Sequence, residues 1–545
     1  MKNSKILRAM CFGAAVLMSI SALSGCGNGG QSSTPSSSKD NSQADTPASS
    51  NVAATDSVYP IDTDETIVFW EPLTLYNARY TSYGETEVAQ ELEKRTGIKV
   101  KYEHPATGMA QEQFNMLIAS NELPDIVKAD WYSYGGQKAI DEGLILNLSD
   151  VMDDWAPNFK NNVCSDPEIA KMLKTDEGNY YAMGFMRDEA AQCVYCGPII
   201  RKDWLDELNL DVPETIDEWQ TMLQAFKDQK GCEAPLSFEF VFTVYGFLTG
   251  AYGVIDDYYV GDDGQIKYGP QEAGYKDWLI EMNEWYEKGL LDQNFATTDS
   301  SILAGYVLND KTGASYGYAG GYIGGWLEAK SGDPSFALVG AKYPVLNKGD
   351  KPQFGQRDWE YVNGAAYAVS AKSKNAELAV RFLDYGYGEE GQMLYNYGIE
   401  GKSYEIKDGK PVFTEFVTNN PDGIDFSTLY SEYAKASSNA PTIQFRAVQE
   451  AERVYPEQNE AVALWSDTDM DKHKLPLISL SADETDAISS RITEIRTFAD
   501  EMKFAFITGN KPISEFDEYV EQLKAMGVDE VIATYGVALE RYNNR

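Results

Sequence analysis

Residues 66–70 read TIVFW, a short apolar run that is followed by Glu71-Pro72. This pattern is typical of a buried strand that delivers its carboxyl end to a loop. The segments after it alternate in type, and Gly97 is placed to end the first helix. An order of strand, helix, strand, helix, strand predicts a parallel sheet with crossover helices, so the first lobe is expected to be α/β. The predicted elements are strand 66–70, helix 85–95, strand 98–102, helix 111–120 and strand 123–127.

A second set of elements follows. Thr215 and Glu218 form a capping box behind Pro213, which predicts the start of a helix. From Thr485 the chain is expected to be almost wholly helical, and no short period recurs, so a repeat array is excluded. The other predicted elements are a crossing strand over 180–185, a helix over 275–288, a strand over 361–369, a helix over 376–385 and a helix capped by Ser514 and Asp517 that runs towards Gly527.

Composition limits the possible functions of this 545-residue chain. It contains 43% hydrophobic and 12% aromatic residues, which excludes a mainly disordered or fibrous protein. The 85 acidic and 46 basic residues give a formal charge of −39, which repels phosphate backbones and makes nucleic acid an unsuitable partner. Only two histidines are present, so His-based metal sites and general bases have almost no candidates.

The first 58 residues predict a targeting and anchoring segment rather than a folded domain. Lys2, Lys5 and Arg8 precede an apolar run over residues 9–23, the layout of a signal peptide spanning residues 1–25. The run ends Leu-Ser-Gly-Cys, which resembles the bacterial lipobox and implies a lipidated Cys26. Residues 26–58 are expected to form a lipidated, disordered tether, because they are almost free of apolar side chains. Cleavage before Cys26 leaves 43 basic against 85 acidic residues, a net charge of −42.

Several strings in the body of the chain resemble the extracellular solute-binding proteins of family 1, in the large lipoprotein branch. The resemblance covers nearly everything after residue 60. It rests on RTGIKV at 95–100, NMLIAS at 115–120, LPDI at 123–126, RKDWL at 201–205 with the capping box after it, and GIEGKSY at 398–404 followed by DGKP at 408–411.

The resemblance implies a fold and a function. The implied fold is α/β and periplasmic-binding-protein-like, with two lobes, a hinge, an interlobe cleft and a helical C-terminal region. The implied function is capture of a carbohydrate, expected to be an oligosaccharide, and its delivery to the permease subunits of an ABC importer. The protein is expected to be a monomer on the extracellular face of the cell membrane. The expected lobes are 59–185 for the first part of lobe 1, 186–362 for the first part of lobe 2, 363–420 for the return to lobe 1, and 421–545 for the mainly helical completion of lobe 2.

Candidate ligand-binding residues lie where predicted strands end. Sugar capture needs flat apolar rings against the C–H faces of pyranoses, together with planar polar groups for the hydroxyls. Such side chains follow the first and third strands and flank the crossing strands, positions at which α/β sheets present ligand loops. Four other tryptophans, Trp204, Trp219, Trp278 and Trp285, fall on helix faces and are assigned to packing. The expected ligand set is Trp70, Glu71, Asp130, Trp131, Tyr132, Arg187, Trp326, Trp359 and Glu360.

Enzymatic alternatives find weak support. A GxSxG string at 313–317 lacks the buried apolar strand before it that a nucleophile elbow needs. The loop over 229–235 offers one carboxylate, too few for a calcium cage, so no metal and no cofactor are expected. Cys193 and Cys196 fit CxxC, but on a strand they face opposite sides, and whether they pair stays open. A peptide or signal binder on the same fold is the main rival, and a secreted carbohydrate-active enzyme a weaker one.

Overall fold

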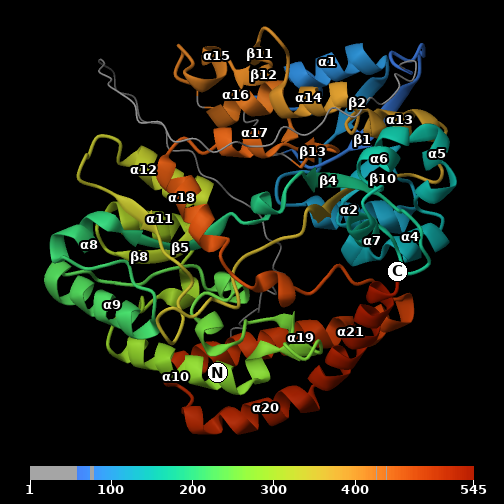
Figure 1. Ribbon diagram of the computed structural model, residues 1–545. Coiled ribbons are helices and arrows are strands. Elements are labelled where there is room, and N and C mark those ends of the chain that lie inside the picture. The colour runs from blue at the N-terminus through green and yellow to red at the C-terminus, as the bar shows by residue number, and fades with distance from the viewer. Residues whose placement is uncertain (1–57, 74–78, 425, 437–438) are drawn as a thin grey trace, which may run out of the picture. The chain divides into compact units, whose positions relative to one another are not determined.

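The computed structural model describes residues 58–73, 79–424, 426–436 and 439–545, and Figure 1 shows its elements. The expected signal peptide and Cys26 lie outside these residues. The larger sheet has six strands in the order β13-β4-β10-β3-β1-β2. Its strands are β1 (Thr66–Trp70), β2 (Lys99–Glu103), β3 (Ile126–Ala129), β4 (Met183–Arg187), β10 (Tyr361–Val369) and β13 (Ile443–Gln444).

The parallel unit predicted at the start of the body is confirmed. β1 pairs in parallel with both β2 and β3, and helices α1 (Glu87–Thr96) and α2 (Ala110–Ser120) form the crossovers. Gly97 ends α1 with φ 76°, a left-handed conformation that glycine adopts without steric cost. The sheet is mixed rather than wholly parallel, because β10 runs antiparallel to β3 and β4.

A hydrophobic core surrounds this sheet, and we call it the first core. Ile67 and Ile126 on the central strands are fully buried, because helices cover the sheet around them. The helices that contribute to it are α1, α2, α3 (Trp131–Tyr134), α4 (Gly136–Asp141), α5 (Met152–Trp155), α6 (Pro157–Asn162), α7 (Pro167–Leu173), α13 (Ala376–Tyr385) and α14 (Glu389–Tyr397).

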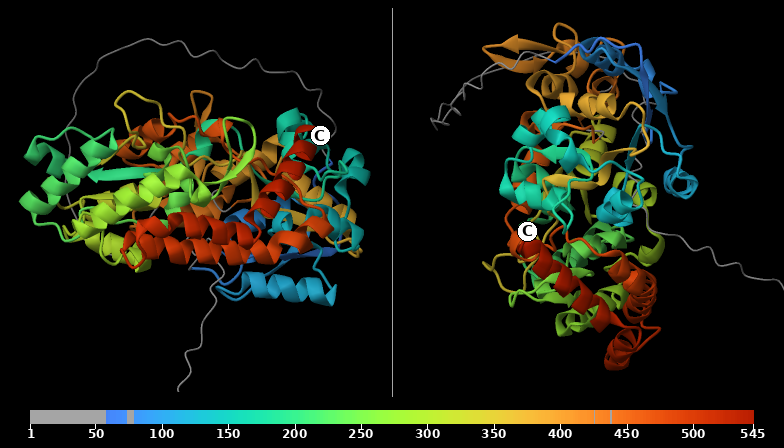
Figure 2. Two further views of the ribbon diagram at one scale, coloured as in Figure 1. Left: turned by 90° about the horizontal axis from the view of Figure 1, so that it is seen from below. Right: turned by 90° about the vertical axis from the view of Figure 1, so that its right-hand side faces the viewer.

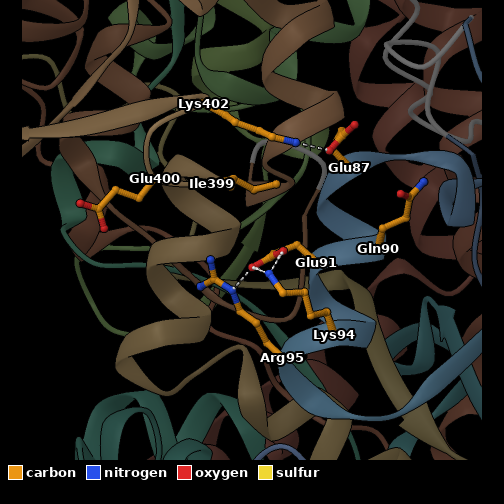
Figure 3. Close-up of a pocket in the computed structure, with 8 residues that line it drawn as sticks. All are labelled: Glu87, Gln90, Glu91, Lys94, Arg95, Ile399, Glu400 and Lys402. Carbon is orange, nitrogen blue, oxygen red and sulfur yellow. Dashed lines mark hydrogen bonds and ion pairs between the residues drawn. The ribbon is translucent and has the colours of Figure 1, made fainter.

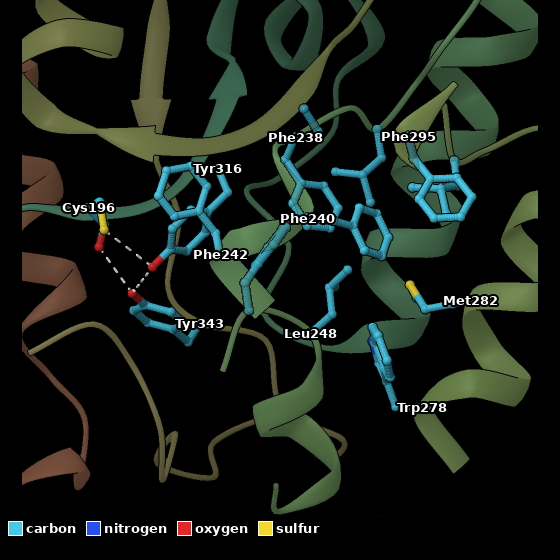
Figure 4. Packing of buried hydrophobic residues seen from close by; sticks show 14 of the residues in the cluster. Cys196, Phe238, Phe240, Phe242, Leu248, Trp278, Met282, Phe295, Tyr316 and Tyr343 are labelled. Atoms are coloured by element: carbon cyan, nitrogen blue, oxygen red, sulfur yellow. Dashed lines mark hydrogen bonds between the residues drawn. The ribbon is translucent and has the colours of Figure 1, made fainter. Parts of the chain in front are cut away.

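The second core forms around a three-stranded sheet, β8-β5-β9. In it β5 (Cys196–Arg201) pairs antiparallel with β8 (Ala314–Tyr318) and with β9 (Leu338–Gly340). Aromatic rings fill the space beneath the sheet, and the Tyr316 and Tyr343 hydroxyls hydrogen-bond at 2.7 Å next to Cys196 (Figure 4). The Tyr343 hydroxyl also donates to the Cys196 carbonyl oxygen at 3.0 Å and accepts from the Gln356 amide at 2.8 Å, so this buried phenol is fully paired.

Helices complete the second core. The capping box predicted at Thr215 and Glu218 is confirmed at the start of α9 (Ile216–Lys230). Trp204, Trp219, Trp278 and Trp285 are at most 3% exposed, which confirms their assignment to packing. Alongside α9, the contributing helices are α8 (Lys202–Leu208), α10 (Ala273–Glu287), α11 (Ser300–Leu308), α12 (Gly325–Ala329), α18 (Pro456–Trp465), α19 (Ala482–Ile507), α20 (Phe516–Ala525) and α21 (Val528–Asn543).

Three segments carry the chain between the two cores. Residues 188–195 join β4 to β5, residues 341–360 join β9 to β10, and the chain leaves β13 for α17 (Arg446–Ala451) and α18. β13 lies beside β4 in the first sheet, so the chain stays with the first core beyond residue 420, where its return had been expected to end. Figure 2 shows the helices of the second core, from α8 to α21, from two further sides.

Smaller elements complete the fold. A third cluster holds the hairpin β11 (Tyr404–Lys407) and β12 (Lys410–Phe413) against α15 (Glu415–Thr418) and α16 (Phe426–Tyr433). A turn at Asp263-Gly264 connects the hairpin strands β6 (Tyr258–Val260) and β7 (Ile266–Tyr268).

One predicted cap is wrong. Ser514 lies inside a short 3₁₀ helix and Asp517 in the first turn of α20, whose N-cap is Glu515 without a side-chain hydrogen bond. The 3₁₀ turn moves the start of the helix by one residue from the position that the capping pattern indicated. Within the described ranges, no helix combines the length and the apolar character needed to cross a bilayer.

Candidate functional site

Two of the crossing segments bring a cation, a carboxylate and a phenol together. Arg187 ends β4, and its Nη1 donates to the Trp359 carbonyl oxygen at 2.8 Å. Its Nη2 lies 3.4 Å from Oδ2 of Asp358, and the Tyr195 hydroxyl donates to the same oxygen at 2.8 Å. Asp358 therefore connects the segment before β5 to the segment before β10, at the boundary between the two cores.

A cluster of four tyrosines, three half-buried and one buried, continues this site on the side of the second core. Because β5 and β8 run antiparallel with Cys196 opposite Tyr318, Tyr195 and Tyr318 emerge at the same edge of the sheet. Their rings stack with centroids 5.9 Å apart, and Tyr245 shares a side-chain hydrogen bond with Tyr195. Tyr322 meets Tyr318 edge-on at 5.7 Å. We call Tyr195, Tyr245, Tyr318 and Tyr322 the tyrosine cluster.

Carboxylates border the tyrosine cluster at two points. Asp358 accepts from Tyr195, and Glu239 accepts a hydrogen bond from the Tyr322 hydroxyl. Burial, followed by the Asp358 carboxylate, raises the pKa of Tyr195 well above its usual value. Burial and the proximity of Asp299 raise the pKa of Glu239. The cluster therefore combines flat rings, neutral hydroxyls and acceptor oxygens.

Trp359 is the half-buried tryptophan of the site. The Lys474 ammonium lies 3.5 Å from its ring centroid, and the indole Nε1 donates to the Leu475 carbonyl oxygen at 3.2 Å. Lys474 also donates to the Asp358 carbonyl oxygen at 2.9 Å. Glu360 follows Trp359, and its carbonyl oxygen accepts from the Arg187 amide at 2.9 Å. Of the nine residues expected from the sequence, Arg187, Trp359 and Glu360 are therefore brought together.

Four other expected residues have their side chains inside the cores. Trp131 is fully buried, donates from Nε1 to the Val127 carbonyl at 3.0 Å and packs edge-on against Phe114. Trp70 and Trp326 are 5% and 4% exposed. Strand ends deliver side chains to the core as readily as to a ligand loop, because only one side of the chain faces outwards there. The structure therefore shows no open ring face on these three tryptophans.

Glu71 is engaged in a buried ion pair rather than presented to solvent. Its Oε1 accepts from Lys435 Nζ at 2.5 Å, and Lys128 Nζ lies 3.9 Å from its Oε2. Burial lowers the pKa of Lys128 to about 8. Lys435 is 364 positions away along the sequence, so no local pattern could reveal this pairing.

Asp130 and Tyr132 make structural contacts at the boundary of the first core. Asp130 is the N-cap of α3 and accepts from the Ser133 amide at 2.9 Å. Tyr132 donates from its hydroxyl to the Ile478 carbonyl oxygen at 2.5 Å, which links α3 to the segment that precedes α19. Both are used in fixing the first core against later parts of the chain.

The sequence reasoning missed the tyrosine cluster, Glu239 and Lys474. Tyr195 and Tyr318 come from strands that pair only in the folded protein, and a chain with 35 tyrosines gives no reason to select them. One available signal was the position of Tyr195, which lies inside the CxxC string on the predicted strand and directly precedes β5 in the structure. Lys474 lies in a segment without periodic pattern, so its contact with Trp359 had no local signal.

A charged groove of about 600 Å³ lies elsewhere, between α1 and the loop after α14 (Figure 3). Six of its eight lining residues are charged and none is aromatic, and its charges pair with each other, as Lys402 does with Glu87 at 2.8 Å. It contains none of the expected residues. Without aromatic faces, and with five of its six charged side chains paired to one another, this groove does not fit sugar recognition.

The described residues do not form the arrangements that a hydrolase, a disulfide or a metal site would need. Ser315 of the GxSxG string lies in the middle of β8 with a buried side chain, not on a strand-to-helix elbow. Cys164, Cys193, Cys196 and Cys232 are all free thiols. His104 Nδ1 donates to the Glu71 carbonyl oxygen at 2.8 Å, and His473 Nδ1 donates to the Val260 carbonyl oxygen at 2.9 Å. In the ranges that the structure describes, no three His, Cys, Asp or Glu side chains are grouped as metal ligands.

Comparison with known proteins gives one consistent result. The family model for bacterial extracellular solute-binding proteins matches residues 79–393. The fructooligosaccharide ABC transporter substrate-binding protein FusA of Streptococcus pneumoniae is 23% identical over 82% of this chain and 85% of its own length. The polygalacturonan/rhamnogalacturonan-binding protein YtcQ of Bacillus subtilis is 23% identical over 83% and 88%. The crystal structure of the alginate-binding protein AlgQ2 superposes with a TM-score of 0.70 at 25% identity, covering 88% of this chain and 99% of that one.

Proposed function

Because this chain belongs to the bacterial extracellular solute-binding proteins, we propose that it captures an oligosaccharide and delivers it to the permease of an ABC importer. The observation that carries the proposal is the site between the two cores, where half-buried tyrosines stand beside Asp358, Trp359 and Glu360. Relatives named for fructooligosaccharide and polygalacturonan binding support the same class of ligand.

The chemistry of the site suits a sugar. Rings of Tyr195, Tyr318 and Trp359 offer flat apolar faces for the C–H faces of pyranoses. Asp358 and Glu360 supply acceptor oxygens, and the Tyr318 hydroxyl supplies a donor. We assign the binding surface to these residues together with Arg187. We assign four of the expected residues to packing within the cores, because their side chains are buried: Trp70, Glu71, Trp131 and Trp326.

Capture would use the crossing segments as a hinge between two lobes. Tyr195 and Asp358 lie on these segments and Arg187 directly precedes the first of them, so a ligand bound there touches the parts of the chain that must change when the lobes open. Ligand contacts that are made only when the lobes are closed would shift the conformational equilibrium towards the closed state. We infer a binding protein that breaks no bond in its ligand.

Ligand capture can be tested directly. The full-length protein, solubilised in detergent, is incubated with pools of plant and host oligosaccharides, and native mass spectrometry identifies what remains bound. We expect a stoichiometric carbohydrate complex, a raised melting temperature and an unchanged ligand mass, because a ligand stabilises only the folded state that binds it. Retention of peptides in preference to sugars, or release of cleaved product, would contradict the proposal.

We also propose that Cys26 anchors the protein to the outer face of the cell membrane, as the lipobox pattern at residues 23–26 indicates. Changing Cys26 to Ser should move the protein from the membrane fraction to the medium without altering its ligand affinity. Full retention of the Cys26→Ser variant in the membrane fraction would exclude this anchor.

A further inference from the structure

We propose that the ligand is an uncharged oligosaccharide, and that uronic-acid oligomers are excluded by the charge of the site. This inference rests on the proposed function and adds the chemical class of the sugar. The relatives named above include binders of both kinds, so family membership leaves the choice open. The decision comes from how the charged side chains of this chain are paired.

The cations at the site are already committed to protein partners. Arg187 uses one Nη for the Trp359 carbonyl and directs the other at Asp358. Lys474 is covered by the Trp359 ring, donates to the Asp358 carbonyl and lies 3.4 Å from Asp471. Only 8% of its side chain is exposed. A ligand carboxylate would have to displace these partners to gain an ion pair.

Two more arginines beside the site are paired in the same way. Arg357 donates to the Ser466 carbonyl at 2.9 Å and lies 3.2 Å from Asp471. Arg446 joins Glu189 at 2.9 Å and Glu450 at 2.7 Å. Both guanidinium groups are therefore already paired with carboxylates of the protein.

The acidic groups exceed what these cations neutralise. Asp358 accepts from the Tyr195 hydroxyl, Glu239 accepts from the Tyr322 hydroxyl, and Glu360 directly follows Trp359. Burial, Cys196, Glu239 and Asp358 together raise the pKa of Tyr318. Burial raises the pKa of Asp188, which follows Arg187. Carboxylates accept hydrogen bonds from sugar hydroxyls, whereas a ligand carboxylate placed beside them meets like charge.

Arg453 is the one position where an acidic sugar could find a cation among the described residues near the third crossing segment. Its Nη1 donates to the Asn459 side-chain oxygen at 3.2 Å, and no carboxylate accepts from it in the described contacts. Glu450 and Glu452 are nevertheless close enough to act on its charge. Among the described contacts Asp358 is paired with Arg187, whereas Glu239 and Glu360 form no ion pair. One shared guanidinium does not balance these two carboxylates, so the site as a whole favours neutral ligands.

The experiment compares one set of linkages in two charge states. Polygalacturonan and alginate hydrolysates are offered to the full-length protein as acidic oligomers and again after reduction of their carboxyl groups to hydroxymethyl groups, alongside neutral glucan, fructan and xylan oligomers. We expect every bound species to be neutral, with affinities at least about tenfold above those of any acidic counterpart. Equal or tighter binding of an acidic oligomer overturns the inference. Binding of no sugar in any pool contradicts the proposed function itself.

Two variants test which side chains set the preference for neutral oligosaccharides. Removing two acids in the Glu239→Gln, Glu360→Gln double variant should narrow the preference for neutral over acidic oligomers by about tenfold, since the repelling charges are gone. Glu540→Gln removes an exposed acid on α21 and should leave the preference unchanged. If the double variant keeps the full preference while Arg453→Gln changes it, the carboxylates do not set the selectivity and the inference is wrong.

Discussion

At the scale of single residues, burial decides which aromatic side chains can meet a ligand. Trp131 and Trp359 both follow or precede a strand of the first sheet, and by sequence they are equivalent candidates. In the structure Trp131 is enclosed by Phe114 and Tyr134, whereas Trp359 is half-buried beside the Tyr195 and Asp358 pair. The difference follows from what packs against each ring, which no neighbour in the sequence specifies.

Replacing each of the two tryptophans with alanine separates their roles. Trp131→Ala should lower the free energy of unfolding by about 3 to 5 kcal/mol, because a large cavity opens in the first core. Trp359→Ala should weaken oligosaccharide binding about ten- to a hundredfold with a smaller effect on stability. Chemical denaturation and calorimetric titration measure the two quantities. A stable Trp131→Ala protein with lost affinity would return Trp131 to the binding surface.

At the scale of elements, local signals end helices where the backbone needs a special conformation. Gly97 closes α1 with φ 76°, and a Cβ there would lie 2.2 Å from the Ile61 carbonyl oxygen. The Ile61 amide donates to the Thr96 carbonyl at 2.8 Å, so this backbone cannot move away without losing a hydrogen bond. Glycine is thus required both for the turn and for the close approach of a second segment.

Alanine at Gly97 should therefore cost more than alanine at a comparable glycine. Gly143 also has a positive φ of 66°, but a Cβ there would meet nothing within 4 Å. Gly143→Ala should cost about 1 to 2 kcal/mol of stability, the usual penalty for the left-handed conformation, and Gly97→Ala clearly more. Urea denaturation of both variants measures the difference. Equal losses would show that the contact with Ile61 carries no cost.

At the scale of the whole molecule, a second connection joins the cores besides the crossing segments. Asp176, in the loop before β4, accepts from Arg541 at 2.6 Å and from Arg545 at 2.5 Å. Arg541 of α21 also pairs with Glu484 at 2.6 Å, at the start of α19. The side chain of Arg545 is only 5% exposed, so its ion pair with Asp176 is shielded from solvent screening.

Removing the carboxylate from this cluster should be costly. Asp176→Ala leaves Arg545 buried without its ion pair, which we expect to lower the free energy of unfolding by about 3 kcal/mol or more. Asp517→Ala is a suitable control, because Asp517 pairs with Lys276 but is 87% exposed, and such pairs contribute about 0 to 1 kcal/mol. Calorimetric melting of both variants gives the comparison. A loss no larger for Asp176→Ala than for Asp517→Ala would mean that the cluster does not hold the cores together.

The local secondary-structure elements and the family could be predicted from the sequence alone. Strand 66–70, the strand at 361–369, the helix at 376–385 and the capping box at Thr215 were all predictable, because periodicity and capping are read from residues a few positions apart. The resemblance of its motifs to solute-binding proteins is confirmed by the family match. These properties depend on neighbours along the chain.

The pairing of segments that are far apart in the sequence could be seen only in the folded protein. It placed β13 beside β4, paired Glu71 with Lys435 and brought Tyr195, Tyr318 and Asp358 to one site. It also buried Trp131 while leaving Trp359 partly open. Sheet order, burial and ion pairing depend on contacts between residues that are far apart in sequence, and many sequence patterns satisfy the same local rules. A site built from two crossing segments and the edge of a second sheet could therefore be located only once the chain was folded.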